Sequence, residues 1–234
     1  MASLPAGTIT FLFSDIEGST RLLQQLGDAY GDLVAQHRRL IRESAASAGG
    51  TEIDTQGDSF FFSFVRARDA VAAAIDAQRR LAAAEWPEGV DVKVRMGVHT
   101  GEPTLGDEGY LGLDVVRGAR IAAAAHGGQI LISEATRALL PTELPDGATI
   151  VDLGEHRLKD LDRPERLFQL VAPGLGETFP APETERAPAR EDELTRRINA
   201  FVEHQLEQAF SVDRPPAARG SEGSRWLRRL RRGR

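Results

Sequence analysis

The chain has 234 residues, a formal charge of −6 and no cysteine. The lack of cysteine excludes disulfides and thiolate metal sites, and no apolar run approaches the ~20 residues that a membrane-spanning helix needs. The last 61 residues hold 12 arginines and 10 acidic residues, so the first 173 residues carry a charge of −8. This acidic balance argues against a nucleic-acid-binding domain there, and we expect no specific DNA binding.

The start of the chain lacks the basic residues and apolar stretch of a secretory signal peptide. A protein without cysteine also needs no oxidising compartment. We therefore expect a cytoplasmic protein.

Strand and helix patterns alternate over residues 1–173, which we expect to form one domain with an α/β (α+β) fold and a mixed sheet. The helix after the first strand would be capped by Ser19 or Thr20, and the glycine-rich residues 101–112 predict a mobile loop. The expected elements, in chain order, are a buried strand at 8–14, a helix at 20–47, a hairpin of strands at 51–55 and 59–65, a helix at 67–84, a strand at 90–101, a helix at 114–125, the strand GGQILIS, a short helix from Ser133, and strands at 149–153 and 166–171.

The composition changes after residue 173. Residues 174–190 are rich in proline, glutamate and alanine and predict a flexible linker. Residues 191–210 have the apolar spacing of an amphipathic helix. Residues 211–234 predict a basic, disordered tail, in which six arginines lie beside Trp226 and two leucines. This tail would make a weak contact with an anionic membrane or nucleic acid, or else be a solvated terminus.

Two aspartates stand beside apolar strand segments. Asp15 follows the run FLF, and Asp58 precedes FFF. A carboxylate at the end of a buried strand is costly unless positive charge meets it, and two carboxylates can hold a divalent cation. Alternatively, Asp15 would cap the following helix and Asp58 would sit in a turn.

A small, polar segment separates the first strand from the first helix. Its backbone N–H groups would lie at a helix N-terminus, where they can bind phosphate oxygens. The alternative is an ordinary turn in which glycine supplies backbone freedom. With the two aspartates, the segment predicts a site for a metal and a nucleoside triphosphate. The candidate phosphate-binding residues are Ile16, Glu17, Gly18, Ser19 and Thr20.

Five motifs in this order resemble the catalytic domain of class III adenylate/guanylate cyclases, over roughly residues 7–172. They are FLFSDIEGST, GDSFFFSF, VRMGVHTGEP, ARIAAAAHGGQILIS and GEHRLKDLDRPERLFQL. The resemblance implies a ferredoxin-like βαββαβ core with a mixed sheet, the class III nucleotidyl cyclase fold. It also implies metal-dependent conversion of ATP or GTP to a 3′,5′-cyclic nucleotide and pyrophosphate, in intracellular signalling.

The resemblance further implies roles for single residues. Asp15 and Asp58 would bind two Mg²⁺ or Mn²⁺ ions per site, one activating the ribose 3′-hydroxyl and one gripping the phosphates. Lys159 would reach the phosphates, and Arg120 would stabilise charge in the transition state. The alternatives are an exposed loop lysine and a helix-surface arginine. The family acts as a homodimer with shared active sites, in which the aspartates and the arginine come from different subunits.

The chain departs from the family pattern at three positions, two of which bear on turnover. Four residues before the second metal aspartate, where adenylate cyclases usually have a lysine, it has Asp54. Counted back from Arg120, the usual transition-state asparagine falls on Val116. These departures favour a second hypothesis, a catalytically impaired homologue that binds metal–nucleotide and acts as a sensor or interaction module.

The residue that reads the purine is also altered. The usual base-reading aspartate falls on Gly109, although Asp107, Glu108 or Asp114 would substitute if the loop shifts. His99, between glycines at the end of a strand, is expected to be packed or hydrogen-bonded rather than a metal ligand. A Ser/His/Asp triad has no support from local spacing.

Overall fold

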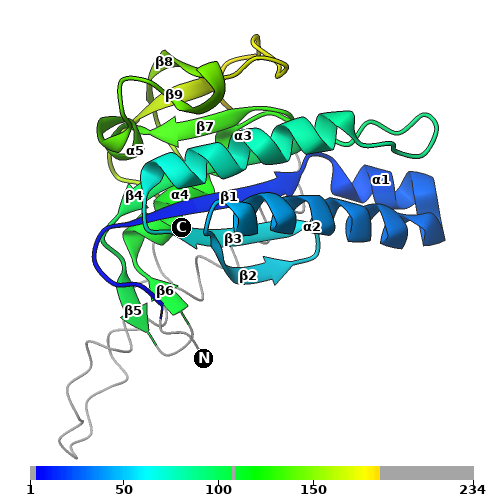
Figure 1. Ribbon diagram of the computed structural model, residues 1–234, viewed down its shortest axis with the longest axis horizontal. Coiled ribbons are helices and arrows are strands. Elements are labelled where there is room, and N and C mark those ends of the chain that lie inside the picture. Colours follow the sequence, from blue (N-terminus) through cyan, green and yellow to red (C-terminus); the bar gives the residue numbers. More distant parts are fainter. Residues whose placement is uncertain (1–3, 107–108, 185–234) are drawn as a thin grey trace, which may run out of the picture.

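A seven-stranded mixed sheet forms the centre of the computed structural model, which describes residues 4–106 and 109–184 (Figure 1). The strand order is β2-β3-β1-β4-β7-β9-β8. Neighbouring strands are antiparallel except β4 and β7, which are parallel. The strands are β1 (Ile9–Ile16), β2 (Thr51–Gln56), β3 (Ser59–Phe64), β4 (Val94–Gly101), β7 (Ile130–Ser133), β8 (Thr149–His156) and β9 (Glu165–Val171).

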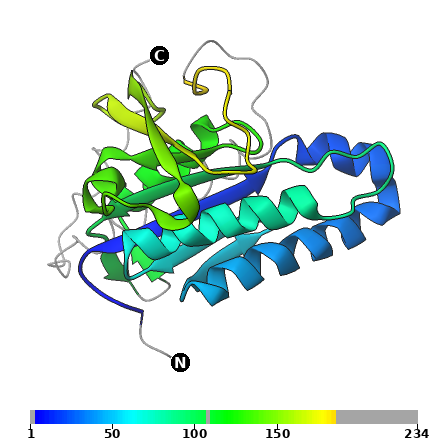
Figure 2. The same ribbon diagram turned by 45° about the horizontal axis from the view of Figure 1, so that its top comes forward.

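Helices cover both faces of this sheet. In Figures 1 and 2, α2 and α3 lie side by side over one face, and α4 lies on the opposite face. The helices are α1 (Ser19–Leu26), α2 (Tyr30–Ser47), α3 (Ala67–Ala83), α4 (Leu113–Ala124) and α5 (Glu134–Leu139), with 3₁₀ turns at Gly27–Ala29 and Pro145–Gly147. The β1-helix-β2-β3-α3-β4 order confirms the expected βαββαβ core in an α/β fold.

Strand β1 is central because its whole length is buried between two apolar layers. Leu12 and Ile16 join the cluster under α2 and α3, whereas Phe11 and Phe13 join the cluster under α4. Successive side chains of a strand point to opposite faces, so a nearly continuous apolar run is what this position requires.

The expected long helix at 20–47 is interrupted. Gly27 has a φ of 53° and ends α1, and a 3₁₀ turn then leads into α2. The predicted cap was also wrong, because Gly18, with a φ of 67°, occupies the N-cap position without a side-chain hydrogen bond. The backbone there is left-handed, a conformation that glycine adopts without steric cost.

The predicted loop at 101–112 was wrong as well. It contains a small antiparallel pair, β5 (Thr104–Gly106) and β6 (Gly109–Leu111). Tyr110 is buried, and its hydroxyl donates a hydrogen bond to the carbonyl of Pro5 at 2.7 Å. Tyr110 packs in the same apolar cluster as Phe11 of β1 and so anchors this segment. The many glycines of the segment had instead suggested a mobile loop.

Residues 173–184, here called the strap, lie against the domain although they form no helix or strand. The N–H of Glu183 donates to the carbonyl of Ala124 at 2.8 Å, and His126 Nε2 bonds the carbonyl of Ala181 at 2.9 Å. The expected domain boundary at 173 stays a prediction. The expected amphipathic helix at 191–210 and basic tail at 211–234 lie outside the described residues. No helix in the described part of the chain is both long and apolar enough to cross a bilayer.

Candidate metal and nucleotide site

The sheet brings Asp15 and Asp58 together. Asp15 is near the end of β1 and Asp58 is in the turn before β3, and these strands pair with Ser14 opposite Phe60. The N–H of Ile16 donates to Asp58 Oδ2 at 3.2 Å. Both aspartates are buried, with 3% and 1% exposure. Asp15 does not cap α1, whose first turn has no side-chain cap.

A buried arginine completes this cluster. Arg95 lies opposite Asp15 in the β1–β4 pairing, and its Nη2 is 3.1 Å from Asp15 Oδ2. Ser59 Oγ donates to Asp15 Oδ1 at 2.6 Å. Arg95 was not among the site residues expected from the sequence. Its signal was an arginine inside the alternating strand VRMGVHTG, since a charge buried in a sheet requires a partner.

Burial and the charge of Asp58 perturb the carboxyl group of Asp15. The pKa of Asp15 is raised to about 7, first by burial and next by the neighbouring charge of Asp58, while Arg95 and Ser59 act to lower it. Two carboxylates this close and this buried are costly when both are ionised. A divalent cation would remove that cost, because it favours the ionised form of both groups.

The available donors fit a divalent ion that is shared with a triphosphate. The described residues contain no group of three or more His, Cys, Asp or Glu side chains that could hold a metal. The protein would therefore supply the two carboxylates, and phosphate and water oxygens would complete the coordination. This division is typical of Mg²⁺, which keeps several waters and binds through one or two carboxylates plus substrate phosphates.

Two amides of the candidate phosphate-binding segment have hydrogen-bond acceptors within the protein. The N–H groups of Ile16 and Glu17 are already used, the first by Asp58 and the second by the carbonyl of Lys93 at 2.8 Å. Both amides therefore serve the fold. The start of α1 at Gly18 to Thr20 remains the candidate phosphate site.

A positively charged side chain, that of Arg21, lies beside the start of α1. The Arg21 guanidinium folds back over Gly18, with Nη2 3.5 Å from the position that a Cβ on Gly18 would occupy. No pattern in the sequence singled out this residue. It lies in the first turn of α1, which places its positive charge beside the helix N-terminus.

Arg120 lies in α4, and Lys159 lies in the loop between β8 and β9. Arg120 is not on a helix surface, because its side chain is only 3% exposed. Its Nη2 forms an ion pair with the carboxylate of Asp160, the residue after Lys159. The ion pair therefore joins α4 to the loop that carries Lys159.

The candidate base-reading positions have local roles where they are described. Asp54 accepts hydrogen bonds from the N–H of Thr55 at 2.8 Å and from Gln56 Nε2 at 3.0 Å. Gly109 has a φ of 132° at the start of β6. Asp107 and Glu108 lie outside the described residues, so their role stays a prediction.

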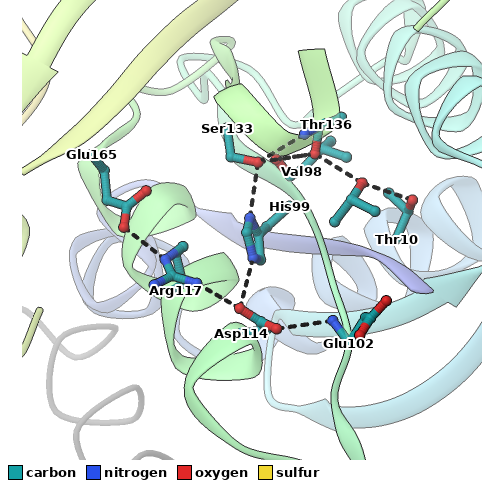
Figure 3. Close-up of polar contacts among 10 residues, drawn as sticks. Thr10, Val98, His99, Glu102, Asp114, Arg117, Ser133, Thr136 and Glu165 are labelled. Atoms are coloured by element: carbon teal, nitrogen blue, oxygen red, sulfur yellow. Dashed lines mark hydrogen bonds and ion pairs between the residues drawn. The ribbon is translucent and has the colours of Figure 1, made fainter. Parts of the chain in front are cut away.

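Asp114, the remaining candidate for reading the base, is engaged inside the protein (Figure 3). Its carboxylate accepts from the N–H of Glu102 at 2.9 Å, pairs with Arg117, and lies 3.4 Å from His99 Nε2. The hydrogen bond with His99 is the main cause that lowers the pKa of Asp114. An ionised carboxylate held on three sides is poorly placed to read a purine.

The same network gives a Ser–His–Asp arrangement without a nucleophile. His99 Nδ1 is 2.8 Å from Ser133 Oγ, and Figure 3 shows the chain of contacts from Ser133 through His99 to Asp114. Ser133 is 1% exposed and caps α5 by accepting from the N–H of Thr136. No substrate reaches such a hydroxyl. His99 is packed and hydrogen-bonded, as predicted, and ties β4 to α4 and α5.

Comparisons with known proteins show which family the chain belongs to. Residues 1–170 match the family described as "Adenylate and Guanylate cyclase catalytic domain". An uncharacterized protein of Mycobacterium tuberculosis is 40% identical over 178 residues, which are 75% of this chain and 60% of that protein. The chain thus spans less than two thirds of the length of such relatives.

Solved structures have the same fold. A monomeric adenylate cyclase of Trypanosoma brucei superposes with a TM-score of 0.70 at 25% identity, covering 79% of this chain and 96% of that one. An adenylyl cyclase of P. aeruginosa gives a TM-score of 0.60 at 28% identity, covering 70% and 94%. The chain belongs to the adenylate and guanylate cyclase catalytic domain family.

Proposed function

We propose that this chain is a nucleotidyl cyclase that converts ATP, or GTP, to the 3′,5′-cyclic nucleotide and pyrophosphate in cytoplasmic signalling. The observation that carries the proposal is the buried pair of Asp15 and Asp58 on adjacent strands, beside the N-terminus of α1. Membership of the family supports the reaction type.

In this proposal Asp15 and Asp58 bind Mg²⁺ or Mn²⁺, which would supply charge compensation at the 3′-oxygen and at the triphosphate. The first amides of α1 and Lys159 orient the triphosphate, and Arg120 places a guanidinium at the charge that develops as the reaction proceeds. The 3′-oxygen forms a bond to the α-phosphorus while the bond from that phosphorus to pyrophosphate breaks.

A homodimer with shared active sites is part of the proposal. Arg120 and Lys159 of one copy would complete the aspartate pair of the other. Leu105 in β5 and Leu113 at the start of α4 are 45% and 53% exposed, so apolar side chains are available for contact with a second copy.

A second candidate function is a module that binds metal–nucleotide without turnover. It is favoured by the ion pair of Arg120 with Asp160, which occupies the predicted transition-state arginine. Asp54, with a charge opposite to the usual lysine, also favours it.

The deciding experiment incubates the purified full chain with Mn²⁺ or Mg²⁺ and each nucleoside triphosphate, and detects cyclic product by chromatography. Asp15→Ala or Asp58→Ala should abolish product and weaken Mn²⁺–ATP binding by about tenfold or more, because one carboxylate alone leaves the ion under-coordinated. Asp91→Ala is the matched control, since this carboxylate is 74% exposed and lies outside the cluster. Parent-like Mn²⁺–ATP binding in both site variants would show that the assignment is wrong.

The same assay tests base selectivity. With Asp54 in place of a purine-reading lysine, we expect ATP and GTP to differ by less than the ~1–3 kcal/mol of a good base contact. Asp54→Lys should raise turnover. Val116→Asn should not help, because Val116 is 1% exposed in the apolar cluster under α4 and an amide there lacks water. A strong preference of the parent for one purine would assign the role to another residue, such as Glu108.

A further inference from the structure

Asp160 has an unusual backbone. Among residues 4–106 and 109–184 it is the only residue other than glycine with a positive φ, at 61°. It is the third residue of a turn in which the N–H of Leu161 donates to the carbonyl of Leu158 at 3.4 Å. A positive φ at this turn position favours glycine or asparagine. An aspartate persists in such a conformation only when its surroundings determine it.

The surroundings are an apolar anchor and a buried charge. Leu158 is 4% exposed and packs in one cluster with Ile121 of α4, and Leu161 packs against the same cluster. Between these two leucines the carboxylate of Asp160 projects to the guanidinium of Arg120. Arg120 is nearly inaccessible to solvent, so the carboxylate supplies charge that water cannot.

This arrangement competes with catalysis. An arginine that stabilises a transition state acts by meeting charge that develops on the substrate. The carboxylate of Asp160 already occupies Nη2 of this guanidinium, and phosphate oxygens must displace it there. Asp160 also directly follows Lys159 in the sequence. Its negative charge therefore stands next to the lysine that is predicted to bind the phosphates.

We propose that Asp160 is a positioning residue that holds Arg120 in its own subunit and restrains its use on the nucleotide triphosphate. This inference rests on the proposed function. In this view the Arg120–Asp160 ion pair limits the activity of a site whose predicted metal ligands, Asp15 and Asp58, are in place.

Asp160→Asn tests the inference, because asparagine tolerates a positive φ and keeps the shape of the side chain without its charge. Asp162→Asn is the matched control, an exposed aspartate of the same loop with the same change of charge. Mn²⁺–ATP affinity is measured by calorimetry, together with initial rates of product formation. We expect Asp160→Asn to raise affinity or kcat/KM about tenfold, which is ~1.4 kcal/mol, and Asp162→Asn to change it by less than about twofold.

A second variant shows whether the gain acts through Arg120. Adding Arg120→Ala to Asp160→Asn should remove the gain, since coupled residues give non-additive effects. A purely structural ion pair would instead lower the melting temperature of Asp160→Asn and leave nucleotide affinity at the level of the Asp162→Asn control. That result overturns the inference.

The inference and the proposed function fail differently. If the parent binds nucleotide and forms product while Asp160→Asn behaves like Asp162→Asn, the inference alone is overturned. If neither the parent nor Asp160→Asn binds Mn²⁺–ATP, both are overturned. Binding or turnover that emerges only in Asp160→Asn supports the inference and identifies the parent as a restrained site.

Discussion

At the scale of single residues, buried polar groups carry most of the information about function. Asp15 and Arg95 are both buried and paired, and Arg120 is buried with Asp160 as its partner. Burying a charge costs several kcal/mol unless a partner and hydrogen bonds compensate, so such pairs persist where they hold a geometry in place. The two pairs lie at the two predicted halves of the nucleotide site.

His37 is a buried group without such compensation. It is fully buried in α2, its ring centroid lies 5.9 Å from that of Phe60, and within the described chain neither ring nitrogen has a hydrogen-bond partner. Burial lowers the pKa of His37 to about 4, with the charge of Asp58 raising it and that of Arg38 lowering it.

The lowered pKa of His37 predicts acid sensitivity. The unfolded chain binds a proton near pH 6.5 while the folded protein does not until about pH 4. The contribution of His37 to stability is therefore complete above pH 6.5 and falls as the pH drops toward 4, by about 2 kcal/mol at pH 5, whereas the raised pKa of Asp15 changes stability in the opposite direction. His37→Leu should remove this loss and leave stability at pH 7.5 equal or higher, because no buried nitrogen then lacks a partner.

Urea denaturation of parent and His37→Leu at pH 7.5 and pH 5 provides the measurement. His156 is only partly buried, so His156→Leu is the control that should leave the acid loss unchanged. Equal acid losses in the parent and His37→Leu would contradict the assignment.

At the scale of elements, the close approach of α4 to the sheet positions Arg120 and the His99 network. A Cβ on Gly97 of β4 would lie 2.3 Å from the backbone nitrogen of Ala122. A Cβ on Gly118 would lie 2.7 Å from the ring of Phe13. Small residues on both elements therefore let the helix backbone lie directly on the strand.

Gly97→Ala should be strongly destabilising, by about 3 kcal/mol, because backbone atoms of α4 cannot yield as a flexible side chain would. Gly31→Ala is the control. Gly31 lies in α2, and a Cβ added there would meet nothing within 4 Å, so alanine should stabilise by about 0.5 kcal/mol. Thermal or urea unfolding measures both, and a Gly97→Ala protein as stable as the parent would mean that α4 lies further from β4.

At the scale of the whole molecule, the strap at the end of the described chain packs beside a turn that contacts the start of α1. Phe179 lies 3.9 Å from the position that a Cβ on Gly128 would occupy, and nearby His126 bonds Ala181. In the same turn the N–H of Gly127 donates to the carboxylate of Glu17 at 3.0 Å. A contact made by the strap therefore reaches the start of α1 through one turn.

Phe179→Ala should loosen the strap and cost about 1–2 kcal/mol of stability, since the ring is partly buried. The loosening is best measured by amide hydrogen exchange. Exchange should accelerate at Glu183, which lies in the strap, and at Gly127, which lies in the turn beside it. Thr178→Ala, at an exposed neighbouring position, should change neither. Unchanged exchange at Glu183 in Phe179→Ala would contradict the docking of the strap.

The sequence by itself determined most elements and brought Asp15 and Asp58 forward as a candidate site. Apolar runs and alternation predicted β1, β3, β4 and α3 within a few residues, and acidic residues at strand ends predicted the Asp15–Asp58 pair. These signals are local, because hydrophobic period follows from the geometry of one helix or strand. The recognisable order of motifs then indicated the family.

The tertiary structure alone decided which charges meet. Arg95 faces Asp15 through an antiparallel register, and Asp160 reaches Arg120 across 40 residues of chain. It also showed that the amides of Ile16 and Glu17 donate hydrogen bonds to Asp58 and to the carbonyl of Lys93. Pairing register and turn conformation depend on contacts distant in sequence, so no local pattern specifies them.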